Sequence, residues 1–297
     1  MKSSIISILG LAVMTSISLV SPAKAVVDIS WTSIGNPGNA ADSSTGYGAV
    51  SYSYNIGTYE VTSAQYVEFL NSAGASNSYG IYDSYIGSLT NITQSGSSGS
   101  YTYSVSSSYA NLPVVGVTWF DAARFSNWLQ NGQGSGSTET GAYTLSGATS
   151  GVILANADAQ IRLPTEDEWY KAAYYNGVTG AYSLYANGQN TITQADANYS
   201  PSSGLVNVNY GKPSSYGAHI GGNAWEWNDA VIGGTKRGLR GGSWASYVGY
   251  LASSYSENDD PSHEGSDVGF RVASVPEPMT GILTIISSGI FLIRRKR

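Results

Sequence analysis

Three stretches of the chain place apolar residues at helical spacing, and each stretch begins with the same polar signal. A threonine stands three residues before a side chain that can reach back to the threonine's own amide, which predicts a capping box at a helix start. The three pairs are Thr62 with Gln65, Thr118 with Asp121, and Thr165 with Glu168. The first and third have the usual capping residues, whereas the second uses a shorter acid.

The predicted helices cover about residues 63–72 and 119–130, and a third begins after Arg162-Leu163-Pro164 and passes Trp169 and Ala173. In each, apolar residues recur along one face at a period of 3.6. We therefore predict three amphipathic helices packed on a core.

Two stretches between these helices, residues 73–109 and 131–151, are rich in Gly, Ser and Tyr. Turn residues and short alternating runs predict long loops or weak hairpins there. No repeat of fixed period occurs, which argues against solenoids and propellers. The pattern predicts one mixed α+β domain over residues 26–274.

The first 25 residues have the form of a secretory signal peptide. Lys2 precedes an apolar stretch over residues 5–20, and Ala23-Lys24-Ala25 forms a cleavage site for signal peptidase. A retained membrane anchor is the alternative, but the stretch is short and interrupted by serines. The sequence thus predicts export.

The other end resembles the PEP-CTERM sorting signal of Gram-negative bacteria. Pro276-Glu277-Pro278 is followed by an apolar run over residues 279–293 and by four basic residues, 294–297. The resemblance implies cleavage by an exosortase within a signal over residues 275–297. The run would span roughly 22 Å of a ~30 Å hydrocarbon core, which favours a transient anchor over the alternative, a permanent single-pass tail. We expect a location in the cell envelope or outside the cell.

Charge and cysteine content exclude several classes of function. Residues 28–275 hold eight basic and nineteen acidic side chains, and this acidic balance argues against nucleic acid as a partner. The chain has no cysteine, so disulfides, zinc-thiolate sites and thiol nucleophiles are excluded together.

Six short motifs follow one another along the chain in an order that resembles the formylglycine-generating enzymes, or sulfatase-modifying factor family. The motifs are Tyr59-Glu60-Val61-Thr62, Leu112 to Trp119, Ile161 to Trp169, Gly222 to Trp227, Arg240 to Trp244, and Gly269-Phe270-Arg271. The resemblance implies the fold of that family, which is related to C-type lectin domains and has long loops. It also implies that Glu226, Arg240 and Arg271 form buried ion pairs.

The chain departs from the family where the family performs its chemistry. Family enzymes carry a cysteine pair about three and eight residues after the serine of the G-G-S motif, and that pair binds copper and activates oxygen. Those positions are Ser246 and Leu251 here. We therefore assign no catalytic residue and expect neither copper nor formylglycine-generating activity.

The resemblance also implies calcium, for which hard oxygen ligands are suited. One family site corresponds to Gly222, Ala224 and Glu226, although its first position is His219 here, and a second begins at Asn198. His263-Glu264 lies in an acidic stretch and is interpreted as a solvated loop.

The remaining candidates concern binding. Trp244 and Ser246 follow the G-G motif directly and are predicted to contact a ligand, with an extracellular polysaccharide as the expected partner. The alternative is an oxidoreductase or other enzyme that uses the same pocket with non-cysteine chemistry. Sequence alone does not choose the ligand.

Overall fold

The computed structural model describes residues 26–275 as a mixed α+β domain. The helices are α1 (Ser63–Ala73), α2 (Ser84–Thr90), α3 (Trp119–Gln130), α4 (Glu166–Tyr174) and the 3-10 helix η1 (Val248–Leu251). The strands are β1 (Trp31–Ile34), β2 (Tyr54–Gly57), β3 (Ile92–Ser95), β4 (Thr102–Val105), β5 (Ile161–Arg162), β6 (Tyr175–Asn176), β7 (Ala181–Tyr182), β8 (Trp225–Ile232), β9 (Lys236–Arg240), β10 (Glu257–Asp259), β11 (Val268–Phe270) and β12 (Ala273–Ser274).

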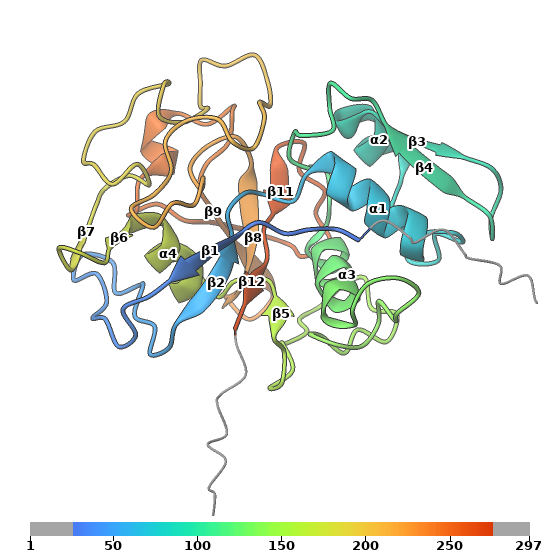
Figure 1. Cartoon of the computed structure of the whole chain (residues 1–297), viewed down its shortest axis with the longest axis horizontal. Coiled ribbons are helices and arrows are strands. Elements are labelled where there is room, and N and C mark those ends of the chain that lie inside the picture. The colour runs from blue at the N-terminus through green and yellow to red at the C-terminus, as the bar shows by residue number, and fades with distance from the viewer. Residues whose placement is uncertain (1–25, 276–297) are drawn as a thin grey trace, which may run out of the picture.

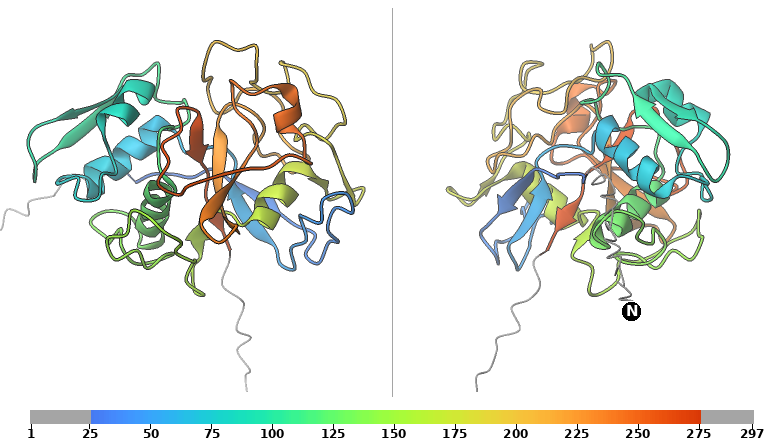
Figure 2. Two further views of the ribbon diagram at one scale, coloured as in Figure 1. Left: turned by 180° about the vertical axis from the view of Figure 1, so that it is seen from behind. Right: turned by 45° about the vertical axis from the view of Figure 1, so that its right-hand side comes forward.

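Two four-stranded sheets form the middle of the molecule (Figure 1). Their strand orders are β1-β2-β12-β5 and β10-β9-β8-β11, and only the β11–β8 pair is parallel among the strand pairs of these two sheets. Figure 2 shows α1, α2 and the β3–β4 hairpin at one end and α4 at the other. The predicted single α+β domain is confirmed.

The three predicted helix starts are confirmed. Thr62, Thr118 and Thr165 each accept a hydrogen bond from the amide three residues later, and the side chain at that position accepts one in return. The capping boxes fix where α1, α3 and α4 begin because each satisfies amides that the helix itself leaves free.

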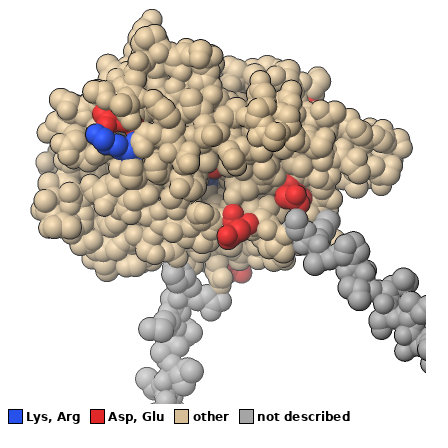
Figure 3. Space-filling view, turned by 45° about the horizontal axis from the view of Figure 1, so that its top comes forward, with Lys and Arg blue, Asp and Glu red and all other residues tan. Residues whose placement is uncertain are grey.

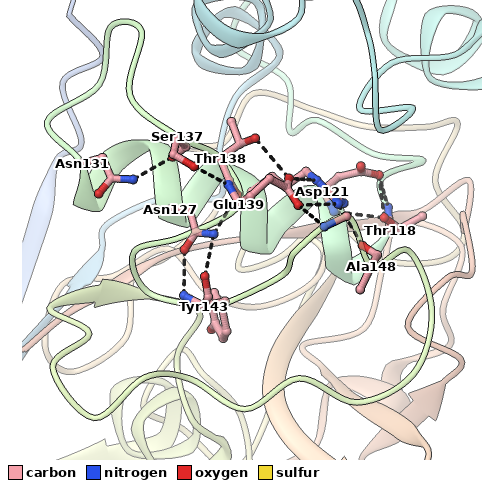
Figure 4. Close-up of polar contacts among 11 residues, drawn as sticks. Thr118, Asp121, Asn127, Asn131, Ser137, Thr138, Glu139, Tyr143 and Ala148 are labelled. Carbon is pink, nitrogen blue, oxygen red and sulfur yellow. Dashed lines mark hydrogen bonds and ion pairs between the residues drawn. The ribbon is translucent and has the colours of Figure 1, made fainter.

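The apolar face of α3 packs on the core as predicted, but its polar face is buried as well, since residues 119–129 are all buried. The loop over residues 131–151 covers the polar face of α3 (Figure 4). Asn127 donates to the carbonyls of Thr138 and Tyr143 at 2.7 and 3.0 Å and accepts from the Tyr143 amide. Arg124 pairs with Glu139 at 2.8 Å. The polar residues of α3 therefore anchor a loop and do not face solvent.

Within residues 73–109 the structure forms more than loops. The predicted hairpin is β3–β4, but α2 was not predicted. Asp83 caps α2 by accepting from the Ile86 amide at 2.8 Å, and Asn91 ends it in the left-handed conformation. Its seven residues include Ser, Gly and Thr, which lack a clear helical pattern, so tertiary contacts of Ile86 decide the helix.

The core joins α1 and α3 through aromatic rings. Phe69 and Phe125 meet edge to face at 5.5 Å, and Phe125 meets Phe270 of β11 at 5.3 Å. Trp227 of β8 is fully buried and donates to the Val117 carbonyl. Among residues 26–275, no helix has the length and apolar character needed to cross a membrane; the predicted signal peptide and apolar tail lie outside the described residues.

A fully buried ion pair ties the two sheets to α4. Arg271 donates to both carboxylate oxygens of Glu226 at 2.5 and 2.7 Å and to the carbonyls of Gly57 and His219 at 2.7 Å each. Trp169 of α4 donates to the same carboxylate at 2.8 Å. The expectation that Glu226, Arg240 and Arg271 form buried ion pairs is confirmed: Arg271 pairs with Glu226, and Arg240 pairs with Glu166.

We predict that Arg271→Met lowers the free energy of unfolding by about 3–5 kcal/mol, because it leaves the buried Glu226 carboxylate without its partner. The control is Lys212→Met, whose pair with Asp196 is 2.6 Å long but 65% exposed on the lysine side, and a loss below about 1 kcal/mol is expected there. Urea denaturation of both variants measures the difference. Equal losses would contradict the central role of Arg271.

Candidate functional site

A cleft of about 410 Å³ opens beside Trp244. Its walls come from segments that are far apart in the sequence, namely α2, residues 108–115, residues 203–205, the turn after β9 and the loop before β11. The lining residues are Leu89, Ser108, Tyr109, Leu112, Val115, Ser203, Gly204, Leu205, Trp244 and Ser266. No lining residue is charged, and apolar side chains alternate with hydroxyls.

Two glycines after β9 place Trp244 on this cleft. Gly241 and Gly242 have φ values of +100° and +73°, in the left-handed region that glycine adopts without a steric penalty. A Cβ atom on Gly242 would lie 2.6 Å from Leu251 Cδ1. The chain then continues to Trp244, whose amide donates to the Asn223 carbonyl at 2.9 Å. The R-G-G-S-W motif thus forms a tight turn that places the Trp244 side chain at the cleft.

Ser246, predicted to contact a ligand, does not line this cleft and is 7% exposed. Its Oγ accepts from the Ser243 amide at 2.9 Å and lies 3.1 Å from Ser243 Oγ, which donates to Asp267 at 2.5 Å. The Ser246 hydroxyl therefore both accepts and donates a hydrogen bond within the turn. No histidine takes part in the hydrogen bonds described for Ser246, so the arrangement does not form a Ser-His-Asp triad.

Leu251, at the second position of the family cysteine pair, is also structural. It is 2% exposed, packs close to Gly242, and its carbonyl accepts from the Tyr174 hydroxyl at 3.1 Å. The two positions that correspond to the family's cysteine pair are consequently buried here, although residues 247–250 between them are exposed.

The residues predicted to hold calcium lie together only in part. Asn198 and Gly222 form a β-bridge, and the Asn198 carbonyl accepts from the Asn223 amide at 2.7 Å. The Glu226 carboxylate, however, already accepts three hydrogen bonds from Arg271 and Trp169. This donor set does not fit a calcium site as it stands, because Glu226 would have to leave Arg271. Calcium at Asn198, Gly222, Ala224 and Glu226 stays a prediction.

Glu60, in the first motif, is a buried carboxylate with weak pairing. Arg271 lies 3.9 Å away, and the Asn223 amide donates at 3.4 Å. Burial, opposed by Arg271 and reinforced by Glu226, raises the pKa of Glu60 to about 8. The sequence identified Glu60 only as a motif residue. Its raised pKa was not predicted, because it depends on Glu226 and Arg271, which lie far away in the sequence.

Sequence analysis also missed most of the cleft. Leu89 lies on α2, which was not predicted, Leu112 begins the second motif, and Leu205 stands in a Ser- and Gly-rich loop. No local pattern in the sequence indicates that these three leucines line one cleft. His263, interpreted as part of a solvated loop, is half exposed beside Asp259.

Comparison with known proteins identifies the family. Residues 41–275 match the sulfatase-modifying factor enzyme 1-like domain, and the chain therefore belongs to this family. Solved structures of similar fold include CarF, with a TM-score of 0.59, 24% identity, and coverage of 85% of this chain and 100% of CarF. Treponema denticola variable protein 1 has a TM-score of 0.58, 24% identity, and coverage of 86% and 98%. These likenesses confirm the fold.

Curated relatives carry this domain within longer proteins. Serine/threonine-protein kinase pkn1 of Chlamydia pneumoniae is 26% identical over 243 residues, which cover 75% of this chain and 33% of the kinase. Pkn1 of Chlamydia caviae is 26% identical over 245 residues with the same coverage. This chain spans about a third of the length of these relatives.

We predict that Ser246→Ala destabilises the protein by about 1–3 kcal/mol, because the buried Ser243 amide loses its acceptor. Ser254→Ala is the control, since Ser254 is exposed and its hydroxyl has no hydrogen bond among residues 26–275. Thermal denaturation compares the two variants. A Ser246→Ala protein as stable as the control would show that the turn does not need this hydroxyl.

Glu60→Gln should change how stability depends on pH. The folded-state pKa of Glu60 lies above its ordinary value of 4.5, so its contribution to stability is complete below about pH 4 and is lost as the pH rises through about 8. The glutamine stays neutral, and the stability of the variant relative to wild type should rise by roughly 1 kcal/mol or more between about pH 5 and about pH 8. Urea denaturation at each pH measures this difference.

Glu68→Gln on α1 is the control for that measurement, because Glu68 is in no ion pair of the described domain. Its stability should follow the wild-type curve. A Glu60→Gln variant that runs parallel to the wild type would mean that Glu60 is ionised throughout this pH range.

Proposed function

We propose that this member of the sulfatase-modifying factor family is an exported ligand-binding protein that lacks the thiol chemistry of its relatives. The single observation that supports binding is the uncharged cleft of about 410 Å³ beside Trp244. Its size suits one or two sugar units or a short peptide segment. The chain has no cysteine, so a thiol-based reaction in this cleft is excluded by composition.

Export is part of the proposal and rests on the two ends of the chain. Residues 1–25 have the signal-peptide pattern, and residues 275–297 have the PEP-CTERM pattern with its exosortase cleavage site. We propose that signal peptidase and an exosortase process the protein and that the apolar tail holds it in the inner membrane until cleavage. The domain then acts in the cell envelope or outside the cell.

The chemistry of the cleft favours an uncharged extracellular polysaccharide. Trp244 and Tyr109 offer aromatic rings for the apolar faces of sugars, while Ser108, Ser203 and Ser266 offer hydroxyls for hydrogen bonds. Since no lysine or arginine lines the cleft, an anionic ligand would lack a counter-charge there. A neutral glycan matches both features.

The test is binding of the full chain to immobilised neutral polysaccharides, namely dextran, cellulose, a galactomannan and a β-1,3-glucan, with alginate as an anionic comparison. Trp244→Ala should weaken binding by at least about tenfold, equivalent to about 1.4 kcal/mol. The matched control is Trp31→Ala, because Trp31 on β1 is 37% exposed and does not line the cleft. Its affinity should equal that of the wild type.

Two outcomes would contradict the proposal. One is that no neutral polysaccharide of the panel binds, or that alginate alone binds. The other is that Trp244→Ala and Trp31→Ala bind with equal affinity, which would mean that the polysaccharide does not bind in the cleft.

A further inference from the structure

A second hollow of about 410 Å³ lies close to the Trp244 cleft. Three segments build it: the entry to α1, the end of the loop before the second motif, and residues 207–209. The residues that line this second hollow are Tyr59, Thr62, Ala64, Gln65, Asn111, Asn207, Val208 and Asn209. None is charged, and amide side chains predominate.

Three of these amides are available to a ligand. Within residues 26–275, the side chains of Asn111, Asn207 and Asn209 make no hydrogen bond to the protein, and all three residues are exposed. Gln65, by contrast, is used in the capping box of α1 and by the Asp28 carbonyl. Tyr59 adds an aromatic ring that is half buried against His219 at 5.3 Å. Amides beside one aromatic ring are suited to sugar hydroxyls and a sugar face.

The two hollows share one seam. Asn111 lines the second hollow and its neighbour Leu112 lines the Trp244 cleft. On the facing segment, Asn207 lines the second hollow and Leu205, two residues earlier, lines the cleft. The Val208 amide donates to the Asn111 carbonyl at 3.0 Å and joins the two segments. Both hollows therefore border a single hydrogen-bonded contact between residues 108–112 and 203–209.

Charge is also scarce on one face of the molecule. In the view of Figure 3, acidic and basic side chains occupy a few small areas and the rest of the face carries neither. A ligand that crosses the seam would meet the free amides of Asn207 and Asn209, and no residue that lines either hollow is charged.

We infer that the two hollows bind one extended, uncharged glycan chain that crosses the seam, with Trp244 at one subsite and Asn207 and Asn209 at the other. This inference rests on the proposed function and adds the length of the ligand to it. In this arrangement a single sugar unit occupies one hollow only. A longer chain occupies both and loses the entropy of association once, so its affinity is higher.

The experiment measures the affinity of the full chain for disaccharide, tetrasaccharide and octasaccharide fragments of the panel polysaccharide that binds. The wild type should bind the octasaccharide at least about tenfold more tightly than the disaccharide. Asn207→Ala/Asn209→Ala should keep the disaccharide affinity and lose the gain with length. Trp244→Ala should weaken binding of every fragment.

Asn258→Ala is the matched control, because the Asn258 side chain likewise makes no hydrogen bond within the described domain and the residue lies on β10. It should bind all fragments as the wild type does. The extended site is contradicted if the octasaccharide binds no more tightly than the disaccharide, or if the double variant keeps the gain in affinity with length. In either case, weaker binding by Trp244→Ala would still support the proposed function. If Trp244→Ala has no effect, both are wrong.

Discussion

The buried pair of Arg271 and Glu226 is the interaction on which the rest of the structure depends. Its guanidinium reaches the carbonyls of Gly57 and His219, and its carboxylate receives the indole of Trp169. These groups come from β2, the loop before the G-N-A-W-E-W motif, β8 and α4. A charge removed from water requires partners on all sides, so the pair forms only when these distant segments have come together.

This dependence explains what the family motifs mean in this chain. Glu60, Trp169, Glu226 and Arg271 belong to four of the six motifs, and all four lie around the same buried centre. The motifs therefore specify how the domain packs, and they persist without the cysteine pair. The segment after R-G-G-S-W uses Ser246 and Leu251 for packing. The two hollows combine residues of three motifs with residues of segments that carry no motif, such as 203–205 and 207–209.

The sequence predicted those features of the fold that depend on residues close together in the chain, and it did not predict features that depend on contacts between distant residues. Capping boxes depend on residues three apart, so α1, α3 and α4 were placed correctly. Full burial of α3 depends on the following loop, whose residues Glu139 and Tyr143 contact Arg124 and Asn127 of the helix. The periodicity of apolar residues within the helix cannot indicate these contacts. Likewise, Trp244, which was predicted to contact a ligand, does line a cleft. The motifs indicated that Glu226 and Arg271 form buried ion pairs, but that the two pair with each other depends on a contact 45 residues apart.

An uncharged site limits how tightly a single sugar can be held. A neutral hydrogen bond contributes about 1 kcal/mol net and an aromatic contact about the same, so one hollow with a few such contacts supplies roughly 4 kcal/mol, which corresponds to millimolar affinity. Binding in the micromolar range needs about twice that free energy. Since no charged side chain lines either hollow, the proposed glycan would reach that free energy by repeating weak contacts along a polymer, and the Ser, Tyr and Asn side chains on both sides of the seam are where those contacts would form.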